Sequence, residues 1–221
     1  MLSNGMGIVE RKAREKEELR QRILDAAGEL IVKEGYENLS MRKLAERIEY
    51  SPSTIYLYFK DKYEILASIC IDVFDRLSAR LEEIHRNEPN PLAGLRQGMR
   101  CYIDFGLSHP SHYLVTFSKP YLPYVQENSE ASLRTMQSGL RCFGCLREAV
   151  VKSIAAGMVR NESPDLIGQS VWTCIHGLTS ALITMGDDPH FPWVEREQLI
   201  ENTVDTILRG IQPFAVHEKI S

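Results

Sequence analysis

Helical periodicity runs through almost the whole of this 221-residue chain and restricts its fold more than any other feature. Apolar residues recur at steps of three and four, the spacing that lines one face of an α-helix. The first such stripe consists of Leu19, Ile23, Ala26, Ala27, Leu30 and Ile31. The alternation in steps of two that marks a half-buried strand never lasts more than a few residues. The sequence therefore predicts an all-α protein of about nine helices.

The ends of the helices are marked by capping residues, glycines and prolines. Gly35 is placed to end the first helix, and Ser40 is placed as the N-cap of the second. Ser51-Pro52 predicts the start of a third helix, since proline suits the first helical position and disfavours helical geometry in the residue before it. A long fourth helix begins after Asp61. Further breaks are expected at 87–91, 108–110, 120–123, 157–164 and 186–192, which leaves two last long helices at about 164–186 and 194–211.

The composition is that of an ordinary soluble protein, with 43% apolar and 25% charged residues. No apolar run approaches the roughly 18 residues needed to cross a bilayer. The N-terminal segment lacks the apolar core of a secretory signal, so we expect a cytoplasmic protein with no membrane partner. Residues 1–62 carry 12 Lys and Arg against 11 Asp and Glu, and the remainder carries 14 against 19. This asymmetry is too small to identify a partner.

Five cysteines, an odd number, are scattered mostly among apolar neighbours, which is typical of reduced core residues. Cys142 and Cys145 form a C-x-x-C pair, but a metal site of that kind needs a second pair of ligands, and we find none. We therefore expect no metal and no cofactor. Two interpretations of the pair stay open: buried thiols on one helix face, or a redox sensor.

Two short helices with a tight break between them, preceded by a longer helix, form a helix-turn-helix pattern in the first third of the chain. The second short helix, which begins at Pro52, would be the recognition helix. It is too short to be stable alone, so neighbouring helices must hold it. Ile55 and Phe59, four residues apart, supply the face that packs against them.

The residues outside that packing face have the chemistry of a DNA-binding surface. Serine and threonine hydroxyls reach phosphates or base edges, and a threonine methyl can contact thymine. Lys60 and Lys62 lie at the start of the fourth helix, where backbone amides and the helix dipole favour a phosphate. Arg42 lies in the first turn of the helix that crosses the DNA backbone in this motif. The alternative is that the rings belong to the core and the lysines are simply solvated.

The stretch "LSMRKLAERIEYSPSTIYLYFKDKYEIL" resembles the DNA-binding domain of the TetR family of transcriptional regulators, over about residues 18–66. Its markers are the Ala26-Ala27 pair, the segment "EGYENLSMRKLAER", and the Thr54-Ile55-Tyr56 and Tyr58-Phe59 pairs that lead into the lysines. The resemblance implies packing roles for Ile55 and Phe59. It implies DNA contacts for Arg42, Ser51, Ser53, Thr54, Tyr56, Tyr58, Lys60 and Lys62.

The turn departs from the family pattern, which commonly reads Ala-Gly-Val-Ser and here reads Ile48-Glu49-Tyr50-Ser51. Glycine adopts the left-handed backbone conformation cheaply, whereas glutamate there costs about 1 kcal/mol or more. Either the turn has another geometry or helix packing absorbs the strain. Tyr50 would fill a site where a smaller valine usually packs.

The rest of the chain carries a second, weaker resemblance. Trp172, His176 and Gly177 look like the Trp-x-x-x-His-Gly signature of one C-terminal domain class in this family. Trp172 and His176 are four apart and share a helix face. Gly177 within a helix costs about 1 kcal/mol relative to alanine, so we expect a packing reason such as close helix approach. His176 either donates to a ligand or is a satisfied core histidine.

The resemblance also implies a homodimer, formed by the last two long helices, that binds double-stranded operator DNA. The preceding helices would enclose a small-molecule effector, and the fourth helix, as the only long rigid element joining the two parts, would carry the signal. Rings and methionines make adaptable apolar walls, which points to an apolar or aromatic effector; the alternative for each residue is plain core. The candidate pocket residues are Met99, Tyr102, Phe105, Tyr113, Phe117, Met136, Phe143, Trp172 and His176.

We therefore expect a DNA-binding helix-turn-helix domain with an N-terminal arm at residues 1–62, and an effector-binding and dimerisation domain at 63–221. The leading hypothesis is a repressor released from a palindromic operator by a small-molecule effector. An activator or a ligand-independent regulator shares the same DNA chemistry. An α-helical enzyme is a distant alternative, since we find no Ser-His-Asp arrangement, phosphate-binding glycine loop or H-x-x-x-H pair. A protein-interaction module is a further one, and salt-dependent binding to a palindromic duplex would separate these classes.

Overall fold

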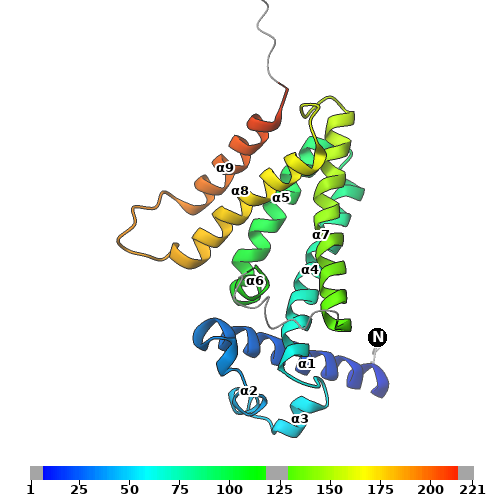
Figure 1. Ribbon diagram of the computed structural model, residues 1–221, viewed down its shortest axis with the longest axis vertical. Coiled ribbons are helices and arrows are strands. Elements are labelled where there is room, and N and C mark those ends of the chain that lie inside the picture. The colour runs from blue at the N-terminus through cyan, green and yellow to red at the C-terminus, as the bar shows by residue number, and fades with distance from the viewer. Residues whose placement is uncertain (1–6, 118–128, 214–221) are drawn as a thin grey trace, which may run out of the picture. The chain divides into compact units, whose positions relative to one another are not determined.

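The structure is a computed structural model that describes residues 7–117 and 129–213 (Figure 1). Within these ranges the chain forms nine α-helices and one short 3-10 helix, and no strand, so the all-α prediction is confirmed. The expected break at Pro120–Pro123 lies outside the described residues. The helices are α1 (Ile8–Glu34), η1 (Tyr36–Asn38), α2 (Met41–Ile48), α3 (Pro52–Tyr56), α4 (Lys62–Asn87), α5 (Pro91–Ser108), α6 (Pro110–Phe117), α7 (Glu130–Ala155), α8 (Pro164–Met185) and α9 (Arg196–Ile211).

The helix boundaries follow the predicted caps. The Ser40 hydroxyl accepts a hydrogen bond from the Lys43 amide at 3.2 Å, and the Ser51 hydroxyl accepts one from the Thr54 amide at 3.2 Å. Gly35 ends α1 with φ at 84°, a region that favours glycine. Each of the two serine caps satisfies an amide that the helix itself leaves unpaired and contributes about 1 kcal/mol.

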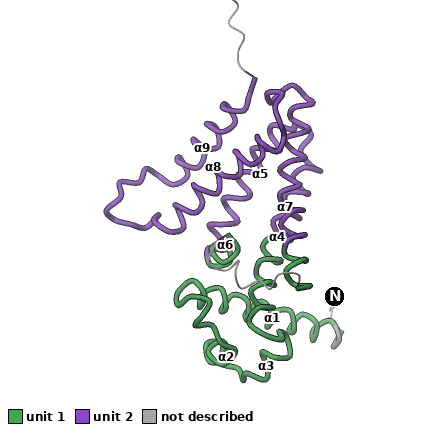
Figure 2. Tube along the Cα trace, viewed as in Figure 1, with its two compact units in different colours: residues 1–73, 111–135 green, residues 74–110, 136–221 purple. Residues whose placement is uncertain are grey.

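The chain divides into two compact units (Figure 2). The first, here called the head unit, comprises residues 1–73 and 111–135, and the second, the body unit, comprises residues 74–110 and 136–221. This division differs from the domain boundary expected after residue 62. The reason is that Ile65, Leu66 and Ile69 of α4 and Val115 of α6 are buried in the same cluster as α1 to α3. The functional boundary at 62 stays a prediction.

Two helices continue across the division between the units. α4 passes from the head unit into the body unit at residue 73, and α7 passes between them at residue 135. In addition, α6 belongs to the head unit although it follows α5 of the body unit almost directly. The expectation that α4 is the only long rigid element joining the two parts is therefore wrong.

The core of the head unit holds the short helices in place. α2 packs against both α1 and α3. Completely buried side chains come from every element of the motif, and burial of each large aliphatic chain stabilises the fold by about 1.5–3 kcal/mol. They include Ile23, Leu24, Ala27 and Ile31 of α1, Leu44 and Ala45 of α2, and Ile55 of α3. Packing against the core thus supplies the stability that a five-residue helix lacks by itself.

In the body unit α5 packs against α8 and α9, and α8 packs against α9. Two arginines of α5 join it to α9. Arg96 pairs with Glu201 at 3.1 Å and also with Asp205, and Arg100 pairs with Glu201 at 3.0 Å and also with Glu197. These pairs are partly exposed, so each contributes little to stability by itself.

α8 is strongly apolar, although it contains no continuous apolar run of membrane-spanning length. Among the described residues it is the one helix long and apolar enough to span a bilayer by length and composition alone, with mean hydropathy 1.2 over its best window. Only 33% of that window is buried. Two faces of α8 are therefore apolar, of which α5 and α9 cover one part.

Candidate nucleic-acid interface

The turn before the recognition helix keeps the left-handed geometry despite its glutamate. Glu49 has φ 62° and ψ 41° and is the one non-glycine residue with positive φ in the described ranges. The Tyr50 amide donates to the Ala45 carbonyl at 2.9 Å, and the Glu49 amide donates to the Glu46 carbonyl at 3.3 Å. These two bonds are the pattern of a Schellman C-cap. Of the two expected explanations, the one in which packing absorbs the strain applies.

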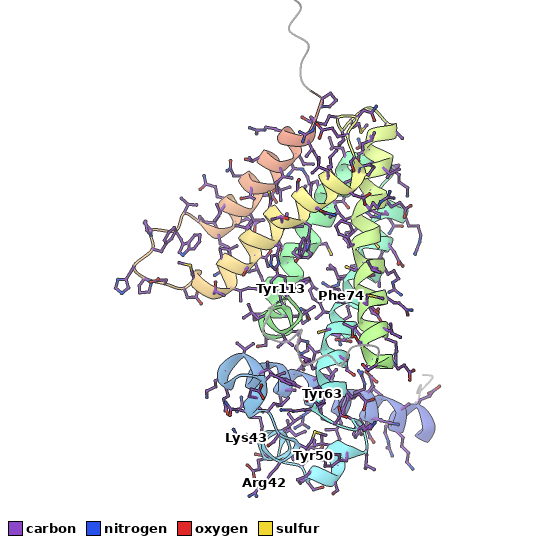
Figure 3. All side chains as sticks on the ribbon, in the orientation of Figure 1. Arg42, Lys43, Tyr50, Tyr63, Phe74 and Tyr113 are labelled. Carbon is purple, nitrogen blue, oxygen red and sulfur yellow. The ribbon has the colours of Figure 1, made fainter. Side chains whose placement is uncertain are left out.

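Tyr50 does not fill the interior position where a valine would pack. The residue is 40% exposed, and the Arg22 guanidinium lies 5.5 Å from the ring centroid. Arg22 also lies 3.5 Å from the Ile48 carbonyl through Nη2. Figure 3 shows Tyr50 among the side chains of the helix-turn-helix. A residue expected to be internal therefore belongs to the surface beside the turn.

The recognition helix α3 is anchored as predicted. Ile55 is completely buried, and Phe59 is buried with the Arg20 guanidinium 5.5 Å from its ring centroid. Tyr58 is half-buried and packs against the same core. Because one face of so short a helix is fixed in the core, its opposite face is fixed towards solvent.

Three hydroxyls lie together at the start of α3. The Ser51 Oγ is 2.7 Å from the Ser53 Oγ and 2.9 Å from the Thr54 Oγ1. Ser51 and Ser53 are exposed, and Thr54 is half-buried. A hydroxyl both donates and accepts, so this cluster holds its members in place and can exchange partners with phosphates or base edges. Tyr56, with 56% of its surface exposed, extends the same polar surface.

The predicted cations differ in their environments. Arg42 is exposed, labelled in Figure 3, and pairs with Glu46 one helical turn away at 2.9 Å. Lys60 is exposed. Lys62 is half-buried instead: its ammonium lies 4.6 Å from the centroid of the Tyr36 ring and 3.5 Å from the Tyr36 carbonyl. Lys62 therefore has a packing partner as well as the phosphate role that the resemblance implies.

The start of α4 is not an open anion site. The Asp61 carboxylate accepts hydrogen bonds from the Tyr63 and Glu64 amides, both at 2.9 Å. The Glu64 carboxylate accepts from the Lys60 amide at 2.5 Å. Three of the amides that we expected to favour a phosphate are therefore already occupied by side chains. The lysine side chains remain the candidates for a phosphate contact at this place.

The sequence places Leu57 on the outward face of the recognition helix but assigns it no DNA contact. Leu57, which caps α3, has 79% of its surface exposed. Hydroxyls and cations indicate DNA binding because they can bond to phosphates and base edges. A leucine is equally common in the apolar stripe of any helix, so its residue type does not indicate DNA binding. Its position opposite Ile55 on a helical wheel explains why it is exposed.

Three of the nine candidate pocket residues are joined by hydrogen bonds in the body unit. The Trp172 Nε1–H donates to the Tyr102 hydroxyl at 3.3 Å, and that hydroxyl lies 3.2 Å from His176 Nδ1. The Trp172 and His176 rings stack with centroids 5.2 Å apart. If Tyr102 accepts from Trp172 and donates to His176, the neutral imidazole carries its proton on Nε2. Burial lowers the pKa of His176, which favours that neutral form.

The other candidates are divided between the two units. Met99, Phe105 and Phe143 belong to the body unit; Met99 and Phe105 are buried, and the Phe143 ring lies 3.5 Å from where a side chain on Gly168 would begin. Met136 belongs to the body unit too but is mainly exposed. Tyr113 and Phe117 belong to the head unit, with ring centroids 4.8 Å apart. The pocket as a whole stays a prediction.

The cysteine pair has the environment of core residues. Burial raises the pKa of the Cys142 thiol to about 12 and also raises the pKa of Cys145. Reactive or metal-binding cysteines need the thiolate form, which this burial disfavours. The structure favours the buried-thiol interpretation over a redox sensor.

Two family models match this chain. The profile described as "Bacterial regulatory proteins, tetR family" matches residues 23–69, and "Tetracyclin repressor-like, C-terminal domain" matches residues 95–207. A curated relative, the uncharacterized transcriptional regulator YuxN of Bacillus subtilis, is 25% identical over 128 residues, 58% of this chain and 43% of its own. The chain thus spans less than half the length of the first curated relatives it matches.

Two solved structures share the fold. FadR of Bacillus subtilis in complex with stearoyl-CoA has a TM-score of 0.69 and 22% identity, over 87% of this chain and 99% of its own. AibR in complex with isovaleryl coenzyme A and operator DNA has a TM-score of 0.67 and 20% identity, over 85% and 96%. The second profile alone covers more than half of this sequence. With the helix-turn-helix on which both residues and profile agree, the chain belongs to the TetR family of DNA-binding transcriptional regulators.

Proposed function

We propose that this protein is a cytoplasmic repressor that binds a pseudo-palindromic operator as a homodimer and leaves it when an effector binds the body unit. The observation that carries the DNA-binding part is the two-sided recognition helix. Ile55 fixes one side in the core, and the hydroxyl cluster of Ser51, Ser53 and Thr54 lies at its start beside exposed Tyr56. These groups can contact phosphates and base edges without any rearrangement of the backbone.

Salt dependence tests this proposal directly. The wild-type protein selects a duplex from a random pool, and its affinity for that duplex is measured between 50 and 200 mM salt. Lys60→Ala should weaken binding to all duplexes alike and reduce the salt slope by about one unit, because a phosphate contact positions without specifying. The matched control is Lys152→Ala, a lysine of α7 in the body unit. If the two variants have the same salt slope, Lys60 does not contact DNA.

The homodimer is supported by what α8 leaves uncovered. Leu166 and Met185 are exposed, and no atom lies within 4 Å of where a side chain on Gly177 would begin. The expected close helix approach at Gly177 is therefore not made by residues 7–117 or 129–213. A second copy packed on α8 and α9 would supply it. Two recognition helices would then read half-sites about one helical turn apart, roughly 34–36 Å.

Light scattering and analytical ultracentrifugation test the dimer. We expect Gly177→Leu to weaken self-association and operator binding together, since a large side chain would separate the two copies. Gly144→Leu is the control, because its side chain also begins in open space, but on α7. A monomeric wild-type protein that still binds one half-site tightly would contradict the proposal.

For the effector we propose an acyl-CoA thioester. Two supports are available: FadR and AibR, which share the fold, are described with stearoyl-CoA and isovaleryl coenzyme A, and the candidate pocket combines apolar rings with one polar group. That group is the Tyr102, Trp172 and His176 chain of hydrogen bonds. It resembles the Trp-x-x-x-His-Gly class of C-terminal domains, and its imidazole can donate to a carbonyl oxygen.

Tryptophan fluorescence tests this effector class. The chain has two tryptophans, so Trp193→Phe leaves Trp172 as the only reporter. Titration with acyl-CoAs from four to eighteen carbons should change its emission saturably, whereas free CoA should not. The effective thioester should weaken operator binding, and operator should weaken thioester binding by the same factor, within the usual coupling of about 1–3 kcal/mol. Acyl-CoA that strengthens operator binding would instead indicate an activator or a corepressed regulator.

A further inference from the structure

Leu57 is the most exposed of the large apolar side chains in the described part of the chain, with 79% of its surface accessible. It lies at the end of the recognition helix and caps it with φ −72° and ψ −17°, which is still helical geometry. Its amide donates to the Thr54 carbonyl at 3.2 Å. The backbone therefore fixes the direction of this side chain even though the side chain itself is solvated.

The helical register places Leu57 on the outermost side of α3. Ile55 is completely buried and defines the inward direction. Residues two positions away on either side, Ser53 and Leu57, lie roughly opposite to it and are four apart on one face. Both are exposed, as this geometry requires. The side of α3 that is furthest from the core thus carries one small hydroxyl and one large aliphatic group.

An aliphatic group at that place needs an apolar partner. The major-groove edges of the four bases carry hydrogen-bond donors and acceptors, and the one apolar group among them is the C5-methyl of thymine. The neighbouring hydroxyls can satisfy donors and acceptors, but Leu57 cannot. A contact between Leu57 and a thymine methyl would remove both from water, which favours binding and identifies the base.

We propose that Leu57 is a specificity-determining residue that contacts the methyl group of one thymine in each half-site. This inference rests on the proposed function, in that α3 must enter the major groove. The size of the effect follows from the area of one methyl. Burial of one such group corresponds to about a fourfold change in affinity per half-site. Both half-sites of a dimer together then give about fifteenfold.

The test combines protein and DNA substitutions. The duplex is one that the wild-type protein selects from a random pool, and each of its thymines is replaced in turn by deoxyuridine, which lacks only the methyl. For the wild type, replacement of one thymine per half-site should weaken binding about fourfold, and replacement of both about fifteenfold. For Leu57→Ala the same replacements should have no effect, because the partner of the methyl is already gone.

Two control variants test whether the loss of sensitivity to deoxyuridine is specific to Leu57. Leu140→Ala removes an equally apolar side chain, 64% exposed on α7, and should keep the full sensitivity to deoxyuridine. Thr54→Ser removes the one other aliphatic methyl at the start of α3 while it keeps the hydroxyl that bonds to Ser51. Thr54→Ser should also stay sensitive at the thymine assigned to Leu57. Circular dichroism and thermal unfolding confirm that all variants are folded.

Three outcomes would overturn the assignment. In the first, Leu57→Ala keeps the wild-type response at every thymine. In the second, Leu57→Ala weakens binding to all duplexes equally, as expected of a backbone contact. In the third, the response disappears in Thr54→Ser and persists in Leu57→Ala, which transfers the methyl contact to threonine. Failure of the wild type to select any duplex would instead refute the proposed function itself.

Discussion

The candidate functional residues of the head unit lie mainly at the surface, whereas several of those in the body unit are buried. In the head unit a small core holds α3, and the candidate DNA contacts are mostly on its surface, as with Ser53 and Tyr56. In the body unit several pocket candidates, such as Met99 and Phe105, are buried. Substitution of an exposed residue can therefore change function without changing stability. Substitution of a buried residue changes both. Each prediction below tests this separation in one unit or in both.

The largest effect is expected where the core of the head unit is changed. Ile55→Ala removes a completely buried side chain and should lower the free energy of unfolding by about 3 kcal/mol, with loss of DNA binding. Tyr56→Ala, one residue further on and 56% exposed, should leave stability within about 0.5 kcal/mol and still weaken DNA binding. Urea unfolding and operator titration measure both. Equal losses of stability would show that the two faces of α3 are not independent.

The next largest effect on stability is expected where α6 packs against α1. A side chain on Gly28 would begin 2.8 Å from the Cδ2 atom of buried His112, whose Nε2 lies 3.3 Å from the Asp25 carboxylate. Gly28→Ala must displace that ring, and we expect a net loss of about 1–2 kcal/mol although alanine favours helix. Gly144→Ala, which meets no atom within 4 Å, should gain about 0.5–1 kcal/mol.

The functional consequence of Gly28→Ala distinguishes coupling from stability. Because α6 follows α5 of the body unit in the chain and is buried with the head unit, its displacement should change the response of operator binding to effector. Operator affinity is titrated with and without effector at a temperature where the variant is fully folded. An unchanged response in a destabilised variant would mean that α6 packs against α1 without transmitting the signal.

The sequence made the head unit far more predictable than the body unit. Caps at Ser40 and Ser51 and the inward pair Ile55 and Phe59 were all predicted correctly, because local chemistry decides them. The exposure of Tyr50 was not, since it depends on Arg22 of another helix. Long-range packing of this kind leaves no local pattern.

In the body unit the same residue types serve the core and a pocket. Phe105 and Met99 are buried as either interpretation requires, so composition does not separate the two. The hydrogen-bonded chain through Tyr102 was also invisible, because its members lie about 70 residues apart in the sequence. Among the pocket candidates, the contact between Trp172 and His176 could be predicted, because residues four apart share a helix face.

A pH-dependent loss of stability should arise in the body unit. Burial lowers the pKa of His176 and of His85 in the folded protein, so the unfolded chain binds protons more readily at these positions. Stability is then full above the unfolded-state pKa of about 6.5 and decreases as the pH falls below it. His176→Phe should flatten the dependence between pH 7 and 5. A steeper decline in that variant would contradict the neutral imidazole inferred from Tyr102.

The smallest effect on stability is expected at Arg42, where the two units can be compared directly. Arg42 is 83% exposed and, among the described residues, pairs only with Glu46, which is 63% exposed, so Arg42→Ala should change the free energy of unfolding by less than about 0.5 kcal/mol. On DNA it should lower the salt slope by about one unit, since one phosphate contact is lost. Glu46→Gln should leave stability equally unchanged and should not weaken DNA binding, because it removes a negative charge beside the phosphates. Arg100 is the counterpart in the body unit. Each of its pairs with Glu197 and Glu201 of α9 contributes little alone, but Arg100→Ala removes them together, so it should lower the free energy of unfolding more than Arg42→Ala does and leave the salt slope unchanged. Two arginines with equal effects on the salt slope would show that charge in the body unit also meets DNA, and the separation between the units would then fail.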